Sequence, residues 1–200
     1  MNISPLPFTL PHGMLFWLVY LWAFHLSEIP AVFSVPARAA QAELPPQDSF
    51  RRFKQVWFCA LLLALVASAW EPAQIAARSV HPLFWLGLGL MLAGSWLRRH
   101  CFRLLGRDFT LEVRASATQT VVDRGAYAWV RHPAYSAGIV MLVGLGLALG
   151  SWASLAILAT MAAVLYSRRI MFEERAMNQA LGDTYTAYAR GRKRLVPYLC

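Results

Sequence analysis

The feature that most constrains this chain is a stretch of 33 residues, 134–166, without a single charged side chain. As one helix it would be about 50 Å long at 1.5 Å per residue, whereas the hydrocarbon core of a bilayer is about 30 Å thick. Gly150 and Ser151 lie near its middle, and both residue types favour a turn. The stretch therefore predicts a hairpin of two membrane-spanning helices, 134–149 and 152–170.

Three further apolar stretches precede the hairpin, at residues 10–29, 56–70 and 83–97. Apolar residues make up 58% of the chain and charged residues 14%, whereas a soluble domain contains about 45–50% and about 25%. We therefore expect an all-α integral membrane protein with five transmembrane helices. Residues 1–200 should form a single membrane domain.

The basic residues indicate how these helices are oriented. All of the 19 Lys and Arg residues except Arg78 lie after the first span, after the third span, or at the end of the fifth span and beyond it. With five helices these segments share one side of the membrane, so the positive-inside rule places the N-terminus outside and the C-terminus in the cytosol. We expect a bacterial inner membrane and a cytosolic active site. The same distribution explains the formal charge of +9 without a nucleic-acid partner.

Cysteine and histidine spacing argues against metal chemistry. Cys59, Cys101 and Cys200 form no C-x-x-C pair, and the histidines show no ligand spacing. The sequence therefore predicts no metal site.

Two further features leave their meaning open. The third loop, 98–131, is long for a connector, and the alternation of apolar and polar residues over 109–114 predicts a short strand on the membrane surface. His25 and Glu28 share a helix face at the end of the first span. A carboxylate at that depth suggests a function, but Glu28 could equally reach cytosolic water.

Polar motifs flank the hairpin on both sides. Before it, Pro133 suits the first turn of a helix whose free amides could hold an anion beside Arg131 and His132, although these two could simply anchor the helix in the headgroups. After it, Arg169 and Glu173 share one helix face, with Glu174 on the neighbouring face. The carboxylates could form surface ion pairs, bind a cationic ligand or pair with Arg131 across the hairpin.

Taken together, these motifs resemble the isoprenylcysteine carboxyl methyltransferase family, whose wider group includes the phospholipid N-methyltransferases. The motifs are G-x-Y-x-x-x-R-H-P-x-Y at 125–135, R-x-x-x-E-E at 169–174, G-x-x-Y-x-x-Y at 182–188 and L-V-P at 195–197. The resemblance covers about residues 119–197 and implies that 98–200 form the cofactor-binding catalytic half. Residues 1–97 would contribute three variable helices.

The resemblance implies S-adenosyl-L-methionine as methyl donor. Positions that match donor contacts in the family are Gln119, Thr120, Val121, Val122, Tyr127, His132, Pro133, Ala134, Tyr135 and Glu173. Arg169 matches a substrate-contacting position, so Arg169 and Glu173 are the catalytic candidates. Glu112 falls at a further donor position where the family can carry an uncharged amide.

The expected reaction is carboxyl O-methylation of a prenylated cysteine or a similar lipidic acceptor in the bilayer. An acceptor carboxylate is ionised at pH 7 and needs no general base, whereas an amine would need one. Phospholipid N-methylation and thiol S-methylation fit the same donor motifs. Two other classes stay open: an NADPH-dependent membrane reductase, which shares the R-H-P and tyrosine motifs, and a non-catalytic scaffold or transporter.

Overall fold

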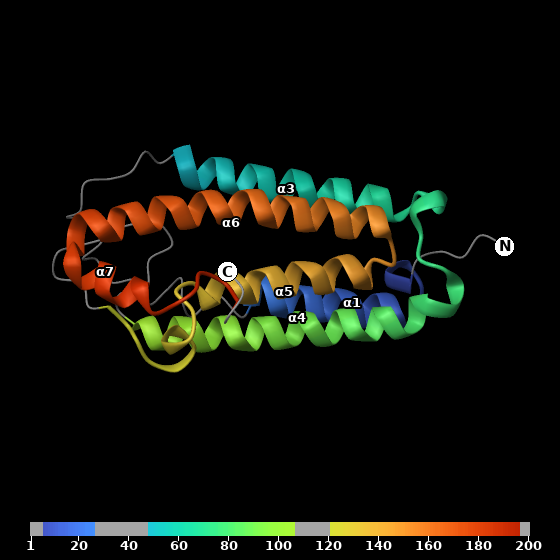
Figure 1. The fold of residues 1–200 in the computed structure, drawn as a ribbon. Helices are drawn as coiled ribbons and strands as arrows, with labels where there is room; N and C mark the ends of the chain where they lie inside the picture. Colours follow the sequence, from blue (N-terminus) through green and yellow to red (C-terminus); the bar gives the residue numbers. More distant parts are fainter. Residues whose placement is uncertain (1–5, 27–47, 107–120, 197–200) are drawn as a thin grey trace.

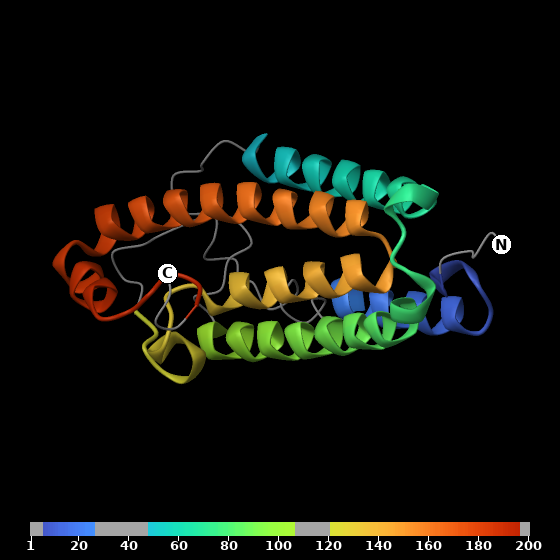
Figure 2. The same cartoon turned by 45° about the vertical axis from the view of Figure 1, so that its right-hand side comes forward.

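The structure, a computed structural model, describes residues 6–26, 48–106 and 121–196. Its long helices run side by side in two layers, which Figures 1 and 2 show from two directions. One layer contains α3 (Asp48–Ser68) and α6 (Trp152–Leu181); the other contains α1 (His12–Leu21), α4 (Ala77–Leu105) and α5 (Pro133–Ala148). The short α7 (Asp183–Arg190) covers one end of the bundle. Within these ranges every regular element is helical, apart from two isolated bridges.

The structure contains the predicted helical hairpin, formed by α5 and α6. Pro133 occupies the first turn of α5, where its missing N–H leaves no helical hydrogen bond unmade. Gly150 adopts a φ of 68°, in the left-handed region that glycine tolerates best, and so reverses the chain. Ser151 then caps α6, because its Oγ accepts a hydrogen bond of 3.3 Å from the backbone N–H of Ser154.

The predicted end of the last span, at residue 170, is wrong for the helix itself. Helix α6 has 30 residues and continues to Leu181. Residues 171–181 contain neither glycine nor proline, so nothing interrupts the helix until Gly182, which has a φ of 50°. The additional turns carry charged side chains beyond the uncharged stretch, which ends at Tyr166. These turns position half of the candidate site.

Two earlier helices are also longer than predicted. The apolar stretch 56–70 overlaps α3, which begins at Asp48 and ends at Ser68, two residues before the stretch ends, and the stretch 83–97 lies within α4, Ala77–Leu105. Apolar patterning marks the part of a helix that suits lipid, whereas Arg, Lys and Gln continue the helix equally well outside it.

Helices α4 and α5 pack backbone against backbone. A Cβ added to Gly87 would lie 2.5 Å from the carbonyl oxygen of Gly144, and one added to Gly144 would lie 2.6 Å from that of Gly87. Small residues allow such close approach between membrane helices. Near the start of α5, Arg98 of α4 donates a hydrogen bond of 3.1 Å to the carbonyl of Ala134. This contact fixes the start of α5 against α4.

Helices α3 and α6 are joined by buried hydroxyl groups. Ser154 Oγ donates to the carbonyl of Ala64 at 2.6 Å, and Ser151 Oγ donates to that of Ala67 at 3.3 Å. Between the layers lies an apolar core whose largest fully buried side chains include Phe16, Phe84, Met91, Met141, Leu145, Leu149 and Leu158. The hairpin is therefore anchored in both layers: α5 packs against α4 and α6 packs against α3.

Two of the described helices are long and apolar enough to cross a membrane by length and composition: Ser79–Leu105 and Trp152–Leu181. Shorter apolar helices are His12–Leu26, Gln55–Ser68 and Pro133–Ala148. The first of these combines α1 with a π-helical turn at Trp22–Leu26, which lies within the predicted span 10–29. The structure thus contains apolar helices at all five predicted places.

Several expectations lie outside the described residues. These are the strand at 109–114, the role of Glu112, the donor positions Gln119 and Thr120, and the role of Glu28.

Candidate active site

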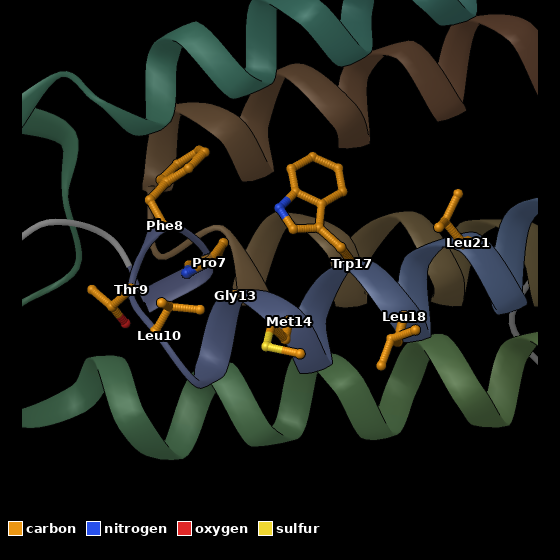
Figure 3. A pocket seen from close by; sticks show the side chains of 9 residues that line it. All are labelled: Pro7, Phe8, Thr9, Leu10, Gly13, Met14, Trp17, Leu18 and Leu21. Atoms are coloured by element: carbon orange, nitrogen blue, oxygen red, sulfur yellow. The ribbon is translucent and has the colours of Figure 1, made fainter.

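The two flanking motifs meet at one end of the bundle. Here the loop before α5, the final turns of α6, helix α7 and the segment after α7 converge (Figures 1 and 2). A short 3-10 helix, η6 (Gly125–Ala128), opens the loop and carries Tyr127. The opposite end contains an apolar pocket between η1 (Leu6–Phe8) and α1, without a charged side chain in its lining (Figure 3). The candidate chemistry therefore lies at the end with α7.

A line of hydrogen bonds joins the two helices of the hairpin. The Tyr135 hydroxyl donates to Glu173 Oε2 at 2.6 Å and accepts from Arg169 Nε at 2.9 Å. The Tyr135 ring stacks with the rings of His132 and Tyr166, with centroid distances of 5.5 and 5.2 Å. One phenol thus connects a cation and a carboxylate on α6, and its ring stacks with two other rings.

His132 lies between the two adjacent carboxylates of α6. Its Nδ1 is 3.8 Å from Glu173 Oε2, and its Nε2 is 3.4 Å from Glu174 Oε1. The residue is buried, with 6% of its surface exposed. Its backbone N–H donates to the carbonyl of Arg194 at 3.0 Å. Ring and backbone are therefore both fixed.

Glu174 is the most strongly paired carboxylate among the described residues of the site. It accepts hydrogen bonds from Arg131 Nη1 at 2.7 Å and from Arg194 Nη2 at 2.9 Å. Burial acts to raise the pKa of Glu174, but hydrogen bonds from His132 and Arg194 and the charge of Arg131 lower it from 4.5 to about 2. Glu174 is therefore ionised at neutral pH.

Three tyrosines form an aromatic wall beside these charges. Tyr127 and Tyr185 are buried, with 7% and 4% of their surfaces exposed. Tyr188 lies beside Tyr185 and donates from its hydroxyl to the carbonyl of Tyr127 at 3.0 Å. Burial raises the pKa of Tyr188 to about 12, which exceeds the opposing effect of Arg192, so the phenol stays protonated. Helix α7 is thereby attached to the loop before α5.

The structure brings together most of the predicted site residues that it describes. Those in or beside the cluster are Tyr127, His132, Pro133, Ala134, Tyr135, Arg169 and Glu173. Val122 packs on the same small core as Tyr127, whereas Val121 is half-buried at the start of the loop. Of the readings left open for the carboxylates, the structure shows the pair between Glu174 and Arg131.

Sequence reasoning missed Arg192 and Arg194 as parts of this cluster. Arg192 Nε donates to the carbonyl of Ala128 at 3.2 Å, and Arg194 pairs with Glu174. Basic residues are so frequent in the C-terminal segment that no charge pattern distinguishes these two. The L-V-P motif was the available signal, because the carbonyl of Leu195 accepts from Ser136 Oγ at 2.5 Å.

The arrangement suits a ligand that carries both signs of charge. Glu173 is partly exposed and next to aromatic rings, which suits a cation. Arg169 donates a hydrogen bond to the same hydroxyl that Glu173 accepts from, and its guanidinium suits an anion. Among the described residues, no three His, Cys, Asp or Glu side chains are grouped so that they could hold a metal ion.

Comparison with known proteins identifies the family. Residues 82–184 match the profile of the phospholipid methyltransferase family. This region begins within α4 and ends in α7, so it contains the hairpin and both flanking motifs. The chain therefore belongs to the phospholipid methyltransferase family, and the resemblance to the isoprenylcysteine methyltransferase group is confirmed.

The similar proteins include isoprenylcysteine O-methyltransferases and methanethiol S-methyltransferases. Protein-S-isoprenylcysteine O-methyltransferase B of Arabidopsis thaliana is 30% identical over 115 residues, 56% of this chain and 58% of that protein. The Schizosaccharomyces pombe protein-S-isoprenylcysteine O-methyltransferase is 24% identical over 204 residues, 89% of this chain and 85% of that protein. Methanethiol S-methyltransferase of Mycobacterium tuberculosis is 32% identical over 136 residues, 66% of this chain and 54% of that protein.

A solved structure shows the same fold. The eukaryotic intramembrane Ras methyltransferase, an isoprenylcysteine carboxyl methyltransferase, superposes with a TM-score of 0.67 at 18% identity. The match covers 94% of this chain and 66% of that one. The arrangement of helices in Figure 1 is thus an arrangement already found in an intramembrane protein.

Proposed function

We propose that this protein is an integral membrane methyltransferase that uses S-adenosyl-L-methionine and a lipid-soluble acceptor, most like a protein-S-isoprenylcysteine carboxyl O-methyltransferase. The observation that carries the proposal is the line of hydrogen bonds from Arg169 through Tyr135 to Glu173. It joins an anion-binding group and a cation-binding group through one phenol hydroxyl. The membership in the phospholipid methyltransferase family supports the same reaction class.

The residues present fit the methyl donor. When bound, the donor supplies an electrophilic methyl group on a sulfonium sulfur. Glu173 would hold a positive centre, and the aromatic faces of Tyr127 and Tyr135 would stabilise positive charge nearby. Arg131 and His132, together with the start of α5, would receive the donor carboxylate. In this proposal Gln119, Thr120, Val121, Val122, Pro133 and Ala134 complete the donor pocket.

Arg169 would orient the acceptor. A carboxylate that is already ionised needs no proton removed, so the protein has to align it and exclude water. The guanidinium of Arg169 can bind a carboxylate through two parallel hydrogen bonds. Because Arg169 also contacts the Tyr135 hydroxyl, acceptor and donor would be held by one connected set of side chains.

A thiol acceptor is the second candidate, favoured by the 32% identity to the mycobacterial methanethiol S-methyltransferase. A neutral thiol must lose its proton before or during methyl transfer. The activity of a thiol-specific enzyme should therefore rise with pH as the thiol loses its proton, and the activity of a carboxylate-specific enzyme should lack this rise.

Three of the exposed tryptophans lie near the ends of the bundle, which supports its placement across a membrane. Trp70 and Trp152, 61% and 55% exposed, lie at the hairpin turn end, and Trp129, 63% exposed, lies at the site end. Tryptophan favours the two interfaces of a bilayer. We infer that the site end faces the cytosol, in a bacterial inner membrane, with the N-terminus outside. Residues 98–200 would then form the catalytic half and 1–97 the variable helices.

Membranes that contain the expressed chain test this proposal directly. They would be incubated with S-adenosyl-L-methionine labelled in its methyl group and with a farnesylated cysteine derivative, a phospholipid amine or methanethiol. Label in the base-labile methyl ester is the expected result. Label only in the lipid amine or in a volatile thioether would show that the acceptor is an amine or a thiol instead. Binding of NADPH with no methyl transfer to any acceptor would indicate a reductase instead of a methyltransferase. Membranes that contain the Glu173→Gln variant give the background level of transferred label.

A further inference from the structure

The two adjacent carboxylates of α6 serve different partners. Glu173 is partly exposed, with 36% of its side chain accessible, and faces Tyr135. The Glu174 side chain is only 11% accessible and contacts three cationic or ionisable side chains: Arg131, His132 and Arg194. A carboxylate this closely surrounded by protein groups has little room for a ligand.

The partners of Glu174 come from two segments that also pair through their backbones. We call residues 192–195 the C-terminal strap. The backbone N–H groups of Arg131 and His132 donate to the carbonyls of Lys193 and Arg194 at 2.8 and 3.0 Å, and a parallel bridge joins Val130 to Lys193. The strap therefore lies along the loop that enters α5, and Glu174 sits across this junction.

Charge explains why the junction needs a carboxylate. Arg131 and Arg194 are both cationic and both approach Glu174 within 2.9 Å. Without the negative charge between them, these side chains would repel each other and would lose short charge-assisted hydrogen bonds. The strap would then be held by its backbone hydrogen bonds and by two bonds from side chains to carbonyls, Arg192 to Ala128 and Ser136 to Leu195.

We propose that Glu174 is a positioning residue: it clamps the C-terminal strap to the loop before α5 and so holds His132 against Tyr135 and Glu173. This inference rests on the proposed function of the pocket. The mechanical link is the imidazole ring, which contacts Glu174 through Nε2 and faces Glu173 through Nδ1. A hydrogen bond at one ring nitrogen fixes the direction of the other.

Two measurements on the purified full chain test the clamp. Hydrogen exchange at the amides of Arg131 and His132 reports strap docking without any ligand, and calorimetry with S-adenosylhomocysteine reports the donor pocket. Glu174→Gln should speed exchange at both amides and weaken binding by about tenfold or more, the loss expected for one charge-assisted hydrogen bond of about 1.5 kcal/mol. Glu173→Gln should weaken binding and leave exchange unchanged.

Arg194 provides a milder variant if Glu174→Gln does not fold. Its side chain is 53% accessible, and Arg194→Gln removes only the strap side of the clamp. In the double variant, Glu174→Gln with Arg194→Gln, these amides should exchange little faster than in Glu174→Gln alone, because the two substitutions break the same interaction. Arg190→Gln removes one positive charge from the exposed surface of α7 and should match wild type in both measurements.

Each outcome has a definite meaning. Unchanged exchange in Glu174→Gln and Arg194→Gln would overturn the clamp, and weaker binding with unchanged exchange would make Glu174 a direct donor contact instead. Faster exchange with wild-type binding would show that the strap does not position the pocket. A wild-type protein that fails to bind S-adenosylhomocysteine would refute the proposed function, while the exchange data would still decide whether Glu174 holds the strap.

Discussion

Tyr135→Phe tests the hydrogen-bond line on which the proposed site depends. The substitution removes one hydroxyl and with it two hydrogen bonds, to Glu173 Oε2 at 2.6 Å and from Arg169 Nε at 2.9 Å. The phenyl ring keeps its stacking with His132 and Tyr166. The change therefore affects the polar link and leaves the packing intact.

The expected loss of donor affinity follows from the charges of Glu173 and Arg169, the two hydrogen-bond partners of the hydroxyl. A hydrogen bond to a charged group contributes about 1.5–3 kcal/mol, and water can replace part of it because Glu173 and Arg169 are both partly exposed. We expect a net loss of about 1–2 kcal/mol in donor binding, which corresponds to about 5- to 30-fold in Kd. The melting temperature should change little, because the aromatic stack remains.

Calorimetric titration with S-adenosylhomocysteine measures this loss, and thermal unfolding of the same samples excludes a folding defect. Tyr20→Phe is the matched control, since Tyr20 is buried in α1 among the core residues, away from the site. It should bind with the wild-type Kd. A wild-type Kd for Tyr135→Phe would show that the phenol does not organise the donor pocket, and the reasoning from geometry would be refuted.

Three other substitutions test the rest of the structure. Gly144→Ala would place a Cβ 2.6 Å from the Gly87 carbonyl oxygen and should cost about 1–3 kcal/mol in the free energy of unfolding, while Gly89→Ala, whose Cβ would meet no atom of another helix within 4 Å, should cost nothing. Arg169→Ala should lower the turnover of a carboxylate acceptor far more than donor affinity; equal losses in steady-state and binding assays would contradict its orienting role. The pKa of Glu174 is lowered from 4.5 to about 2 on folding, so its ionised form stabilises the protein above about pH 4.5, and this contribution is lost as the pH falls towards 2. The melting temperature of wild type should therefore approach that of Glu174→Gln across this window, and a constant difference would contradict the assignment.

The parts of the fold that the sequence predicts are those governed by local chemistry. The uncharged stretch around Gly150 and Ser151 predicts the hairpin because lipid excludes charge and a short turn must join the helices. Helix ends beyond the bilayer are harder to predict. Helix α6 continues to Leu181 through charged residues that satisfy no hydrophobic pattern, and only Gly182 stops it.

The site divides in the same way. Tyr135 and Glu173 belong to short motifs with fixed spacing, so sequence reasoning finds them, and the structure places them 2.6 Å apart. The contacts of the strap with the loop before α5 were not predicted, because they run largely through the backbone and the L-V-P motif alone does not show which segment it contacts. The bond between Ser136 and Leu195 joins residues 59 positions apart, beyond any local pattern.

In the proposed membrane placement, the turn at Gly150 is the segment that crosses the lipid when the hairpin inserts. Gly150 and Ser151 carry no charge, and the Gly150 carbonyl accepts a hydrogen bond of 2.9 Å from the backbone N–H of Ile75. Two apolar helices joined by such a turn can insert together, because only one compact uncharged loop has to pass through the lipid. In the proposed orientation, Tyr135 and Glu173 stay on the cytosolic side, where the ribosome delivers the chain, and their pairing requires no polar group to cross the membrane.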